Sequence, residues 1–213
     1  MISLRGKRRK FSSGRALTPQ KFVTEAQKAT GDWKFDAIAI GFPAPVVNGK
    51  IAAEPKNLGS GWQRFDFRKG LGKPVRVIND AAMQALGSYR GRRMLFLGLG
   101  TGLGSALVWK QHVLSLELGD LPYVNNQSIE DLLGDSGLER VGEKRWQSEV
   151  RRILPALTKA FIADHVVLGG GNAKLINDLP PQVELGHNRN AFTGGIRLWQ
   201  QEPRSRRPAW NII

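Results

Sequence analysis

A glycine-rich segment is the clearest place for chemistry in this sequence. Residues 98–105 read Gly-Leu-Gly-Thr-Gly-Leu-Gly-Ser, and apolar stretches flank them on both sides. Glycines at alternating positions let a backbone turn tightly and direct several N–H groups at one point, which is one way to hold a phosphate. Thr101 and Ser105 add hydroxyl donors. A hairpin built for steric reasons is the alternative, and no Gly-Lys-Ser/Thr follows that would make a Walker loop.

A carboxylate stands at a predicted strand-to-helix junction. Pro74–Ile78 reads as a strand, Asn79 and Asp80 follow it, and Ala81–Leu86 reads as a helix. The positive end of the helix dipole favours an ionised carboxylate there. An ionised aspartate that faces a ligand can accept the proton of a hydroxyl as its oxygen attacks a phosphoryl group. The alternative is that Asp80 only caps the helix.

A second glycine cluster follows a later apolar stretch. Gly169, Gly170 and Gly171 come directly after the predicted strand at residues 165–168, and Asn172 follows them. A surface without side chains suits a nucleotide base, a ribose or a phosphate chain. A tight strand-to-helix turn explains the same residues equally well.

The elements that carry these segments alternate along the chain. A long amphipathic helix is predicted over residues 143–161, with a kink at Pro155. Alternating strands and helices predict an α/β fold. Both glycine clusters follow strands, at the carboxyl ends where open α/β sheets bind ligands. The predicted strands cover residues 36–40, 74–78, 94–99, 105–108 and 165–168.

Short local signals predict where several elements start and turn. Thr18 before a proline predicts a helix start, with the hydroxyl as N-cap. Asn48 and Gly49 lie between apolar pairs and predict a hairpin. Ser128 with Asp131 three residues later predicts a capping box.

Composition narrows the classes of partner. The 213 residues include no cysteine, which excludes disulfides, thiolate zinc sites and cysteine nucleophiles. The formal net charge of +14 favours polyanionic partners such as nucleic acid, a nucleotide, inorganic polyphosphate or an acidic surface. Much of this charge lies at residues 5–10 and 204–207, and solvated tails are the alternative reading of both clusters.

The sequence shows no sign of a membrane helix, a secretory signal or a histidine metal site. No apolar run approaches the roughly 20 residues of a membrane helix. The basic N-terminus is not followed by an apolar core, so it does not read as a secretory signal, and we expect a cytoplasmic protein without a membrane partner. His112, His165 and His187 have no metal-site spacing, and no protein metal site is expected.

The order of the motifs resembles the signature series of the ROK family of sugar kinases. The resemblance is strongest to the polyphosphate glucokinase branch, through residues 79–89 and 192–199, and it covers roughly residues 10–200. The ordered motifs are Gly41–Val46, Glu54–Leu58 with Trp62, Val77–Ala81, Leu97–Ser105, Glu117–Gly119 and Val167–Gly171.

This resemblance implies an actin-like, ribonuclease H-like sugar kinase fold with two α/β lobes. We expect a basic N-terminal tail over residues 1–17, a truncated N-terminal lobe over 18–92, a C-terminal lobe over 93–200 and a basic C-terminal tail over 201–213. Family members begin with a hairpin that carries an Asp-x-Gly-Gly-Thr phosphate loop. That first hairpin of the N-terminal lobe is expected to be missing here, because Lys10–Phe22 already matches the family segment that comes after the hairpin. An apolar edge beside residues 36–40 would then be exposed.

The resemblance also implies phosphoryl transfer to the 6-hydroxyl of glucose or a similar hexose. Asp80 would be the general base for that hydroxyl. Asn57, Asn79 and Glu117 would hold the other sugar hydroxyls. Asp120 stands where the family has a sugar-contacting histidine.

The donor implied by the resemblance is polyphosphate or ATP. Gly100, Thr101, Gly102 and Gly104 would grip its phosphates, with Mg²⁺ shared between donor and protein. Residues 169–171 would form the nucleotide or phosphate-chain surface. The family's zinc cysteines are absent, so zinc is not expected. Homodimers are usual in the family.

The departures from the family pattern keep a second function open. Without the first phosphate loop we expect a glucokinase-type phosphotransferase whose activity is weakened or lost, because phosphoryl transfer depends on positioning and charge stabilisation. Ala44 in place of a glycine and residues 109–111 in place of an Asp-Gly turn also depart from the pattern. A non-catalytic sugar-binding or polyphosphate-binding remnant is the alternative. A nucleic-acid regulator is not expected, because the stretch before Thr18 is too short for a helix-turn-helix.

Overall fold

The structure, a computed structural model, describes residues 8–213 and divides the chain between Asn79 and Asp80. Each of the two compact units, residues up to 79 and residues 80–213, has its own hydrophobic core. The first part of the predicted N-terminal tail, residues 1–7, lies outside the described residues. The lobe boundary proposed between residues 92 and 93 falls after helix α3 (Asp80–Ser88), and this helix packs within the second unit.

A parallel pair of strands lies at the centre of the first unit. β1 (Ile38–Phe42) pairs with β4 (Val75–Asn79), and Phe42 lies opposite Asn79 at the end of the register. The sequence predicted both strands, with bounds that differ by one or two residues. The carboxyl ends of these strands therefore present Asn79 at one edge of the pair.

Local signals set the other elements of the first unit, and the sequence predicted all of them except α2. The side chain of Thr18 accepts the N–H of Lys21 and caps the first helix. Asn48 and Gly49 have φ angles of 51° and 72° and turn an antiparallel hairpin. These elements are α1 (Pro19–Thr30), β2 (Val46–Val47), β3 (Lys50–Ile51) and α2 (Phe67–Leu71).

Aromatic rings form much of the core of the first unit. Trp62 is only 1% exposed, and its ring centroid lies 5.1 Å from that of Phe42, 5.9 Å from Phe22 and 6.1 Å from Phe67. Such edge and stacked contacts add to the free energy gained by burying apolar surface. Trp62 therefore serves to hold the first unit together.

Part of the segment that the sequence assigned to an N-terminal tail also packs on the first unit. Arg9 pairs with Asp32, and its guanidinium lies 5.1 Å from the centroid of the Trp33 ring. The ring of Phe11 lies 6.1 Å from that of Phe22. Residues 9–11 are thus ordered by an ion pair and by aromatic contacts that the local sequence does not reveal.

A six-stranded mixed sheet organises the second unit, in the order β11-β10-β5-β6-β7-β12. β5, β6 and β7 form an antiparallel meander, while β10, β11 and β12 add in parallel to β5, β10 and β7. The three strands predicted in this unit are present. All six are β5 (Met94–Leu99), β6 (Leu103–Trp109), β7 (His112–Leu116), β10 (His165–Gly169), β11 (Val183–Leu185) and β12 (Asn211–Ile212).

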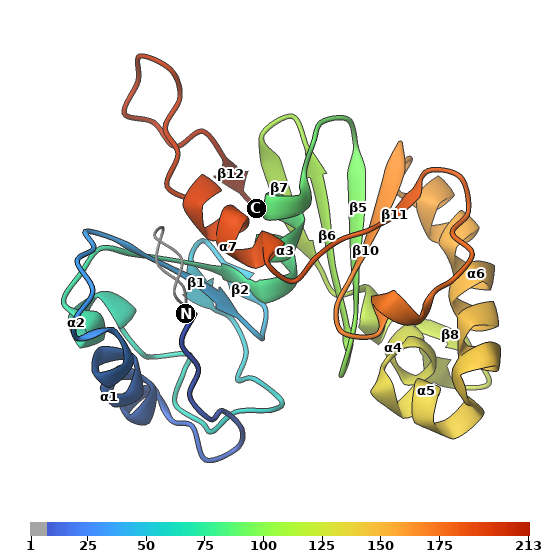
Figure 1. Cartoon of the computed structure of the whole chain (residues 1–213), viewed down its shortest axis with the longest axis horizontal. Coiled ribbons are helices and arrows are strands. Elements are labelled where there is room, and N and C mark those ends of the chain that lie inside the picture. The colour runs from blue at the N-terminus through green and yellow to red at the C-terminus, as the bar shows by residue number, and fades with distance from the viewer. Residues whose placement is uncertain (1–7) are drawn as a thin grey trace. The chain divides into compact units, whose positions relative to one another are not determined.

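Helices cover both faces of this sheet (Figure 1). α3 and α7 pack together on one face, and the two helices touch where a Cβ on Gly194 would lie 1.9 Å from the carbonyl oxygen of Met83. On the other face α6 buries Trp146, Val150 and Ile153 in a cluster that includes the inward side chains of β5. The helices are α4 (Ile129–Leu133), α5 (Asp135–Val141), α6 (Glu143–Ala160) and α7 (Asn190–Arg197).

Shorter elements complete the second unit. The predicted capping box of Ser128 and Asp131 is present at the start of α4. The predicted C-terminal tail instead folds into a hairpin joined by a bridge between Gln201 and Pro208, and it continues into β12. The remaining elements are 3-10 helices at Leu118–Asp120 and Ala173–Leu175 and the strands β8 (Pro122–Val124) and β9 (Gln127–Ser128). Within residues 8–213 no helix is long and apolar enough to cross a membrane.

Candidate active site

Asp80 is the first residue of α3 and follows β4 without a break. Its Oδ1 accepts the N–H of Ala81 at 2.8 Å, which fixes the orientation of the carboxyl. Burial raises the pKa of Asp80 and outweighs the backbone N–H groups, which lower it. The sequence led us to expect that the helix N-terminus would favour the ionised form. The opposite direction follows because the carboxyl loses more hydration than the helix end returns.

The strand that follows the glycine turn runs directly past the start of α3. A Cβ on Gly104 of β6 would lie 2.7 Å from the Cβ of Ala81, so only glycine permits this approach. Gly104 pairs with Gly98 across the β5–β6 hairpin, and the turn of Gly100, Thr101 and Gly102 lies beyond them. Within the second unit, the predicted base and the predicted phosphate segment are therefore neighbours.

Glycine is required in this turn because neighbouring groups come too close for a side chain, and not because of unusual backbone angles. Gly100, Gly102 and Gly104 do not have positive φ. A Cβ on Gly102 would instead lie 2.4 Å from Oε2 of Glu130, and that same oxygen accepts the N–H of Leu103 at 3.0 Å. A carboxylate from α4 thus holds one side of the turn, which the sequence did not indicate.

The second glycine cluster lies beside the first. β10 pairs with β5 in parallel so that Gly169 is opposite Gly98. Gly170 has φ of 85°, and a Cβ there would lie 2.0 Å from the carbonyl oxygen of Leu99. The Cβ position of Gly100 is 4.0 Å from the N atom of Gly171. Both glycine segments that the sequence singled out therefore meet at one end of the sheet.

Two further polar residues tie these segments together. The N–H of Asp135 at the start of α5 donates to the carbonyl oxygen of Gly100 at 2.9 Å. The side chain of Asn172 donates to Oδ1 of Asp135 at 2.6 Å, and its backbone N–H donates to Leu99 at 3.0 Å. Sequence reasoning missed Asp135 because nothing local marks a contact 35 residues away from the glycine turn. Its carboxylate lies at the edge of the turn predicted to hold phosphate.

Of the predicted sugar residues, Glu117 precedes the 3-10 helix after β7 and Asp120 is the last residue of that helix. Ser105 of β6 anchors this segment, because its hydroxyl donates to the carbonyl of Leu116 at 2.8 Å and accepts the N–H of Leu118 at 3.1 Å. Glu117 and Asp120 are both exposed. The second unit thus gathers Asp80, both glycine clusters and this acidic segment around β6.

The other predicted sugar residues belong to the first unit. Asn79 ends β4, is only 8% exposed, and donates its side-chain amide to the carbonyl of Ala44 at 3.3 Å. Asn57 lies exposed on a loop. Glu54 closes that loop, because its carboxylate accepts the N–H of Trp62 at 3.1 Å and of Gln63 at 3.2 Å.

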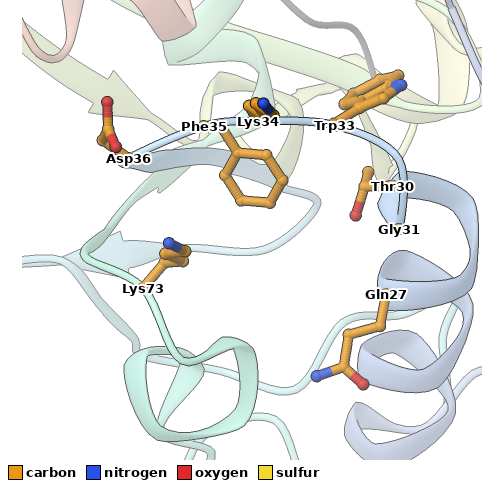
Figure 2. A pocket seen from close by; sticks show the side chains of 8 residues that line it. All are labelled: Gln27, Thr30, Gly31, Trp33, Lys34, Phe35, Asp36 and Lys73. Carbon is orange, nitrogen blue, oxygen red and sulfur yellow. The ribbon is translucent and has the colours of Figure 1, made fainter.

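A pocket of about 500 Å³ lies elsewhere in the first unit (Figure 2). Asp36 precedes β1 and Lys73 precedes β4, so this pocket opens at the amino ends of the strands. It contains none of the predicted site residues, and Asn79 lies at the opposite, carboxyl end of the pair.

Comparison with known proteins supports the resemblance found in the sequence. Residues 16–119 match the profile described as the ROK family. Over this stretch the chain is similar to the ROK family. The match takes in Asp80, the β5–β6 glycine turn and Glu117, and it ends before Asp120 and the glycines at residues 169–171.

Sugar kinases are among the proteins to which this chain is similar. It is 25% identical over 191 residues to polyphosphate glucokinase from Mycobacterium tuberculosis (strain CDC 1551 / Oshkosh), covering 79% of this chain and 71% of the relative. The structure of an inorganic polyphosphate/ATP-glucomannokinase from Arthrobacter sp. strain KM matches with a TM-score of 0.71 and 21% identity, over 83% of this chain and 81% of that one.

A second solved structure is that of a ROK family glucokinase from Streptomyces griseus in complex with glucose and AMPPNP. It matches this chain with a TM-score of 0.63 and 16% identity, over 83% of this chain and 86% of that one. These likenesses confirm the predicted fold class, the actin-like, ribonuclease H-like fold of ROK sugar kinases.

Proposed function

We propose that this chain is a sugar kinase that transfers a phosphoryl group from polyphosphate or ATP to the 6-hydroxyl of glucose or a similar hexose. The observation that carries the proposal is the first turn of α3. There, Asp80 is held by the N–H of Ala81 next to Gly104 of the glycine-rich hairpin. The similarity to polyphosphate glucokinase over 79% of the chain supports the same activity.

Asp80 acts in this proposal as the general base. A carboxylate with a raised pKa is a stronger base than an ordinary one, so it takes the proton of the sugar hydroxyl more readily. The hydrogen bond from Ala81 at 2.8 Å keeps Oδ1 in place while the proton moves to the carboxylate. The attacking sugar oxygen then bonds to phosphorus as the bond to the leaving phosphate breaks.

The glycine segments hold the donor in this proposal. Gly100, Thr101, Gly102 and Gly104 present backbone groups to the donor phosphates, since side chains are absent at three of these four positions. Residues 169–171 lie beside them and accommodate the next part of a phosphate chain or a nucleotide. Glu117 and Asp120, which belong to the same unit as Asp80, hold the sugar.

Mg²⁺ fits this arrangement as an ion that arrives with the donor. Within the described part of the chain no group of three or more His, Cys, Asp or Glu side chains gathers into a metal cage. Magnesium is commonly held by one or two carboxylates together with substrate phosphates. Three carboxylates of this unit, those of Asp80, Glu130 and Asp135, lie next to the glycine segments. Asp80 and Asp135 would complete such a shell, because Glu130 already accepts the N–H of Leu103. When bound, the ion neutralises charge on the transferring phosphoryl group.

A binding protein without turnover is the second candidate. Asp120 favours it, because this acidic residue stands where the family pattern has a sugar-contacting histidine. Saturable glucose binding with no phosphorylation under any donor would support this candidate. A homodimer and a cytoplasmic location accompany the kinase proposal. The homodimer rests on the family likeness, and the location rests on the sequence indications given above.

The direct test is an assay of glucose 6-phosphate formation with long-chain polyphosphate and, separately, with ATP. We expect weak turnover with at least one donor, and loss of that turnover when Mg²⁺ is removed with a chelator. Restoring the ion should restore the rate. Folded protein that binds glucose but forms no product with either donor would contradict the kinase and leave the binding protein.

A further inference from the structure

Positive charge gathers at the end of the second unit's sheet that lies away from the glycine turns. Met94 starts β5 opposite Val108 of β6 and His165 of β10, so the segments before β5 and after β6 meet there. β12 enters at the same end, because Asn211 pairs with His112. We call this set the amino-end basic surface, and it consists of Arg90, Arg92, Arg93, Lys110, Arg204, Arg206 and Arg207.

The central cations of this surface are fixed in place. Arg93 donates to the carbonyl of Ile162 at 2.9 Å, and its guanidinium lies 4.4 Å from the centroid of the Trp109 ring. The ammonium of Lys110 lies 4.7 Å from the same centroid. Because these side chains are already ordered, binding an anion costs them little conformational entropy.

The outer cations are exposed. The side chain of Arg92 is 72% exposed, although it lies 3.6 Å from Asp164. Arg90 and Arg92 line a pocket of about 300 Å³ beside the start of β11. The three arginines of the C-terminal hairpin, at residues 204, 206 and 207, are all exposed at its tip, and this hairpin projects from the sheet (Figure 1).

Carboxylates on the same segments do not balance this charge. Asp164 accepts the backbone N–H of Arg93 at 2.7 Å, and this bond together with the nearby arginines holds its pKa below the usual range. It is therefore ionised and already paired. Glu184 and Glu202 are the other carboxylates on these segments, so seven cations face three acids. The surface attracts an anion with many charges.

We infer that the amino-end basic surface binds the body of a long inorganic polyphosphate chain while the chain's end occupies the glycine turns. This inference rests on the proposed function for the identity of the donor. The six residues of β5 separate the two places by about 20 Å at 3.3 Å per residue. A long chain can engage both places at once, and the second contact then gains from a high effective concentration. A short donor reaches only one.

Aromatic contacts favour a phosphate chain over single-stranded nucleic acid. Proteins that hold single strands stack the bases on open aromatic faces. Here the ring of Trp109 is already engaged by two cations. Trp210 packs edge-on against Tyr89 at 5.6 Å and donates its indole N–H to Gln200. Trp109 and Trp210 are therefore already engaged by neighbouring side chains and are poorly placed to stack on bases.

The test measures equilibrium binding of long-chain polyphosphate and of tripolyphosphate to the full chain. One variant removes Arg90, Arg92 and Lys110, and another removes Arg204, Arg206 and Arg207, each by substitution with alanine. The control variant removes three exposed lysines of the first unit, Lys21, Lys50 and Lys69. Thermal denaturation checks that all variants are folded.

We expect each surface variant to bind the long chain about 10-fold more weakly than the control, with a salt dependence reduced by about 2 in log–log slope for three lost contacts. Tripolyphosphate affinity should be unchanged. Equal long-chain binding by the surface and control variants would overturn the inference. Tighter binding of a single-stranded oligonucleotide than of polyphosphate at the same residues would also overturn it. This test measures binding and not turnover. Its result can therefore be interpreted even if the protein proves to have no kinase activity.

Discussion

Asp80 combines two features that oppose each other in an ordinary helix start. The N–H of Ala81 stabilises the carboxylate, while burial disfavours its charge and raises its pKa. A residue that only caps α3 would gain from being ionised. The raised pKa instead indicates that the ionised carboxylate lowers the stability of the folded chain. Groups with such shifted pKa values are common at functional sites.

The pH dependence of stability tests this cost. Asp80 has a pKa of 3.8 when unperturbed and a higher one in the folded chain. Between those two values the native state binds more protons than the unfolded state, so the free energy of unfolding falls as pH rises through that window. We therefore expect Asp80→Asn to melt no lower than the unchanged chain at neutral pH. The advantage should vanish below the unperturbed pKa.

Thermal melting from acid to neutral pH measures this effect. Asp36→Asn, an exposed aspartate of the first unit, is the matched control and should follow the unchanged chain at every pH. A melting temperature of Asp80→Asn clearly below that of the control at neutral pH would mean that the ionised carboxylate stabilises the native state. Asp80 would then be a helix cap.

At the scale of elements, two glycine turns from different strands lie side by side at one end of the second unit's sheet. Gly170 has the backbone conformation that only glycine adopts easily, and its missing Cβ leaves room for the carbonyl of Leu99. Gly171 has neither constraint, since no atom lies within 4 Å of its Cβ position. Gly170 is therefore required by the fold, whereas Gly171 is not, and substitutions at the two positions can be compared.

We expect Gly170→Ala to lower the free energy of unfolding by about 3 kcal/mol or more, as a clash with fixed backbone and a strained φ both act. Gly171→Ala should leave stability within about 0.5 kcal/mol. Chemical denaturation of both variants measures the difference. Equal stabilities would show that the β10 turn is not packed against β5 as described.

Sequence patterns found the elements that carry the site, because their signals are local. Apolar runs gave β4, β5, β6 and β10, and the glycines marked the turns between them. Patterns did not find β12 or α7, which are short and depend on packing against β7 and α3. They also could not reveal that Glu130 and Asp135 hold the glycine turn, since those contacts join distant parts of the chain.

At the scale of the whole chain, two separate cores imply two separable stabilities. The first unit is built on the aromatic cluster around Trp62, and the second on the apolar face of its sheet. Phe67 is 6% exposed within the aromatic cluster. We expect Phe67→Ala to cost the first unit about 3–5 kcal/mol.

Hydrogen exchange resolved along the sequence reads out this prediction. Amides of the first unit's strands should lose protection in Phe67→Ala, while amides of β5 and β10 keep theirs. An equal loss throughout both units would mean that the chain unfolds as one cooperative block. Leu97→Ala, in the core of the second unit, is the reciprocal variant.

The central claim is that Asp80 takes the proton of a sugar hydroxyl during phosphoryl transfer. The decisive measurement is the rate of glucose 6-phosphate formation by Asp80→Asn and by the unchanged chain, with each donor, together with glucose affinity. We predict that the rate falls by about 10²–10⁴-fold, the usual contribution of a general base, while glucose affinity stays within a few-fold. An Asp80→Asn variant that retains the full rate would contradict the account.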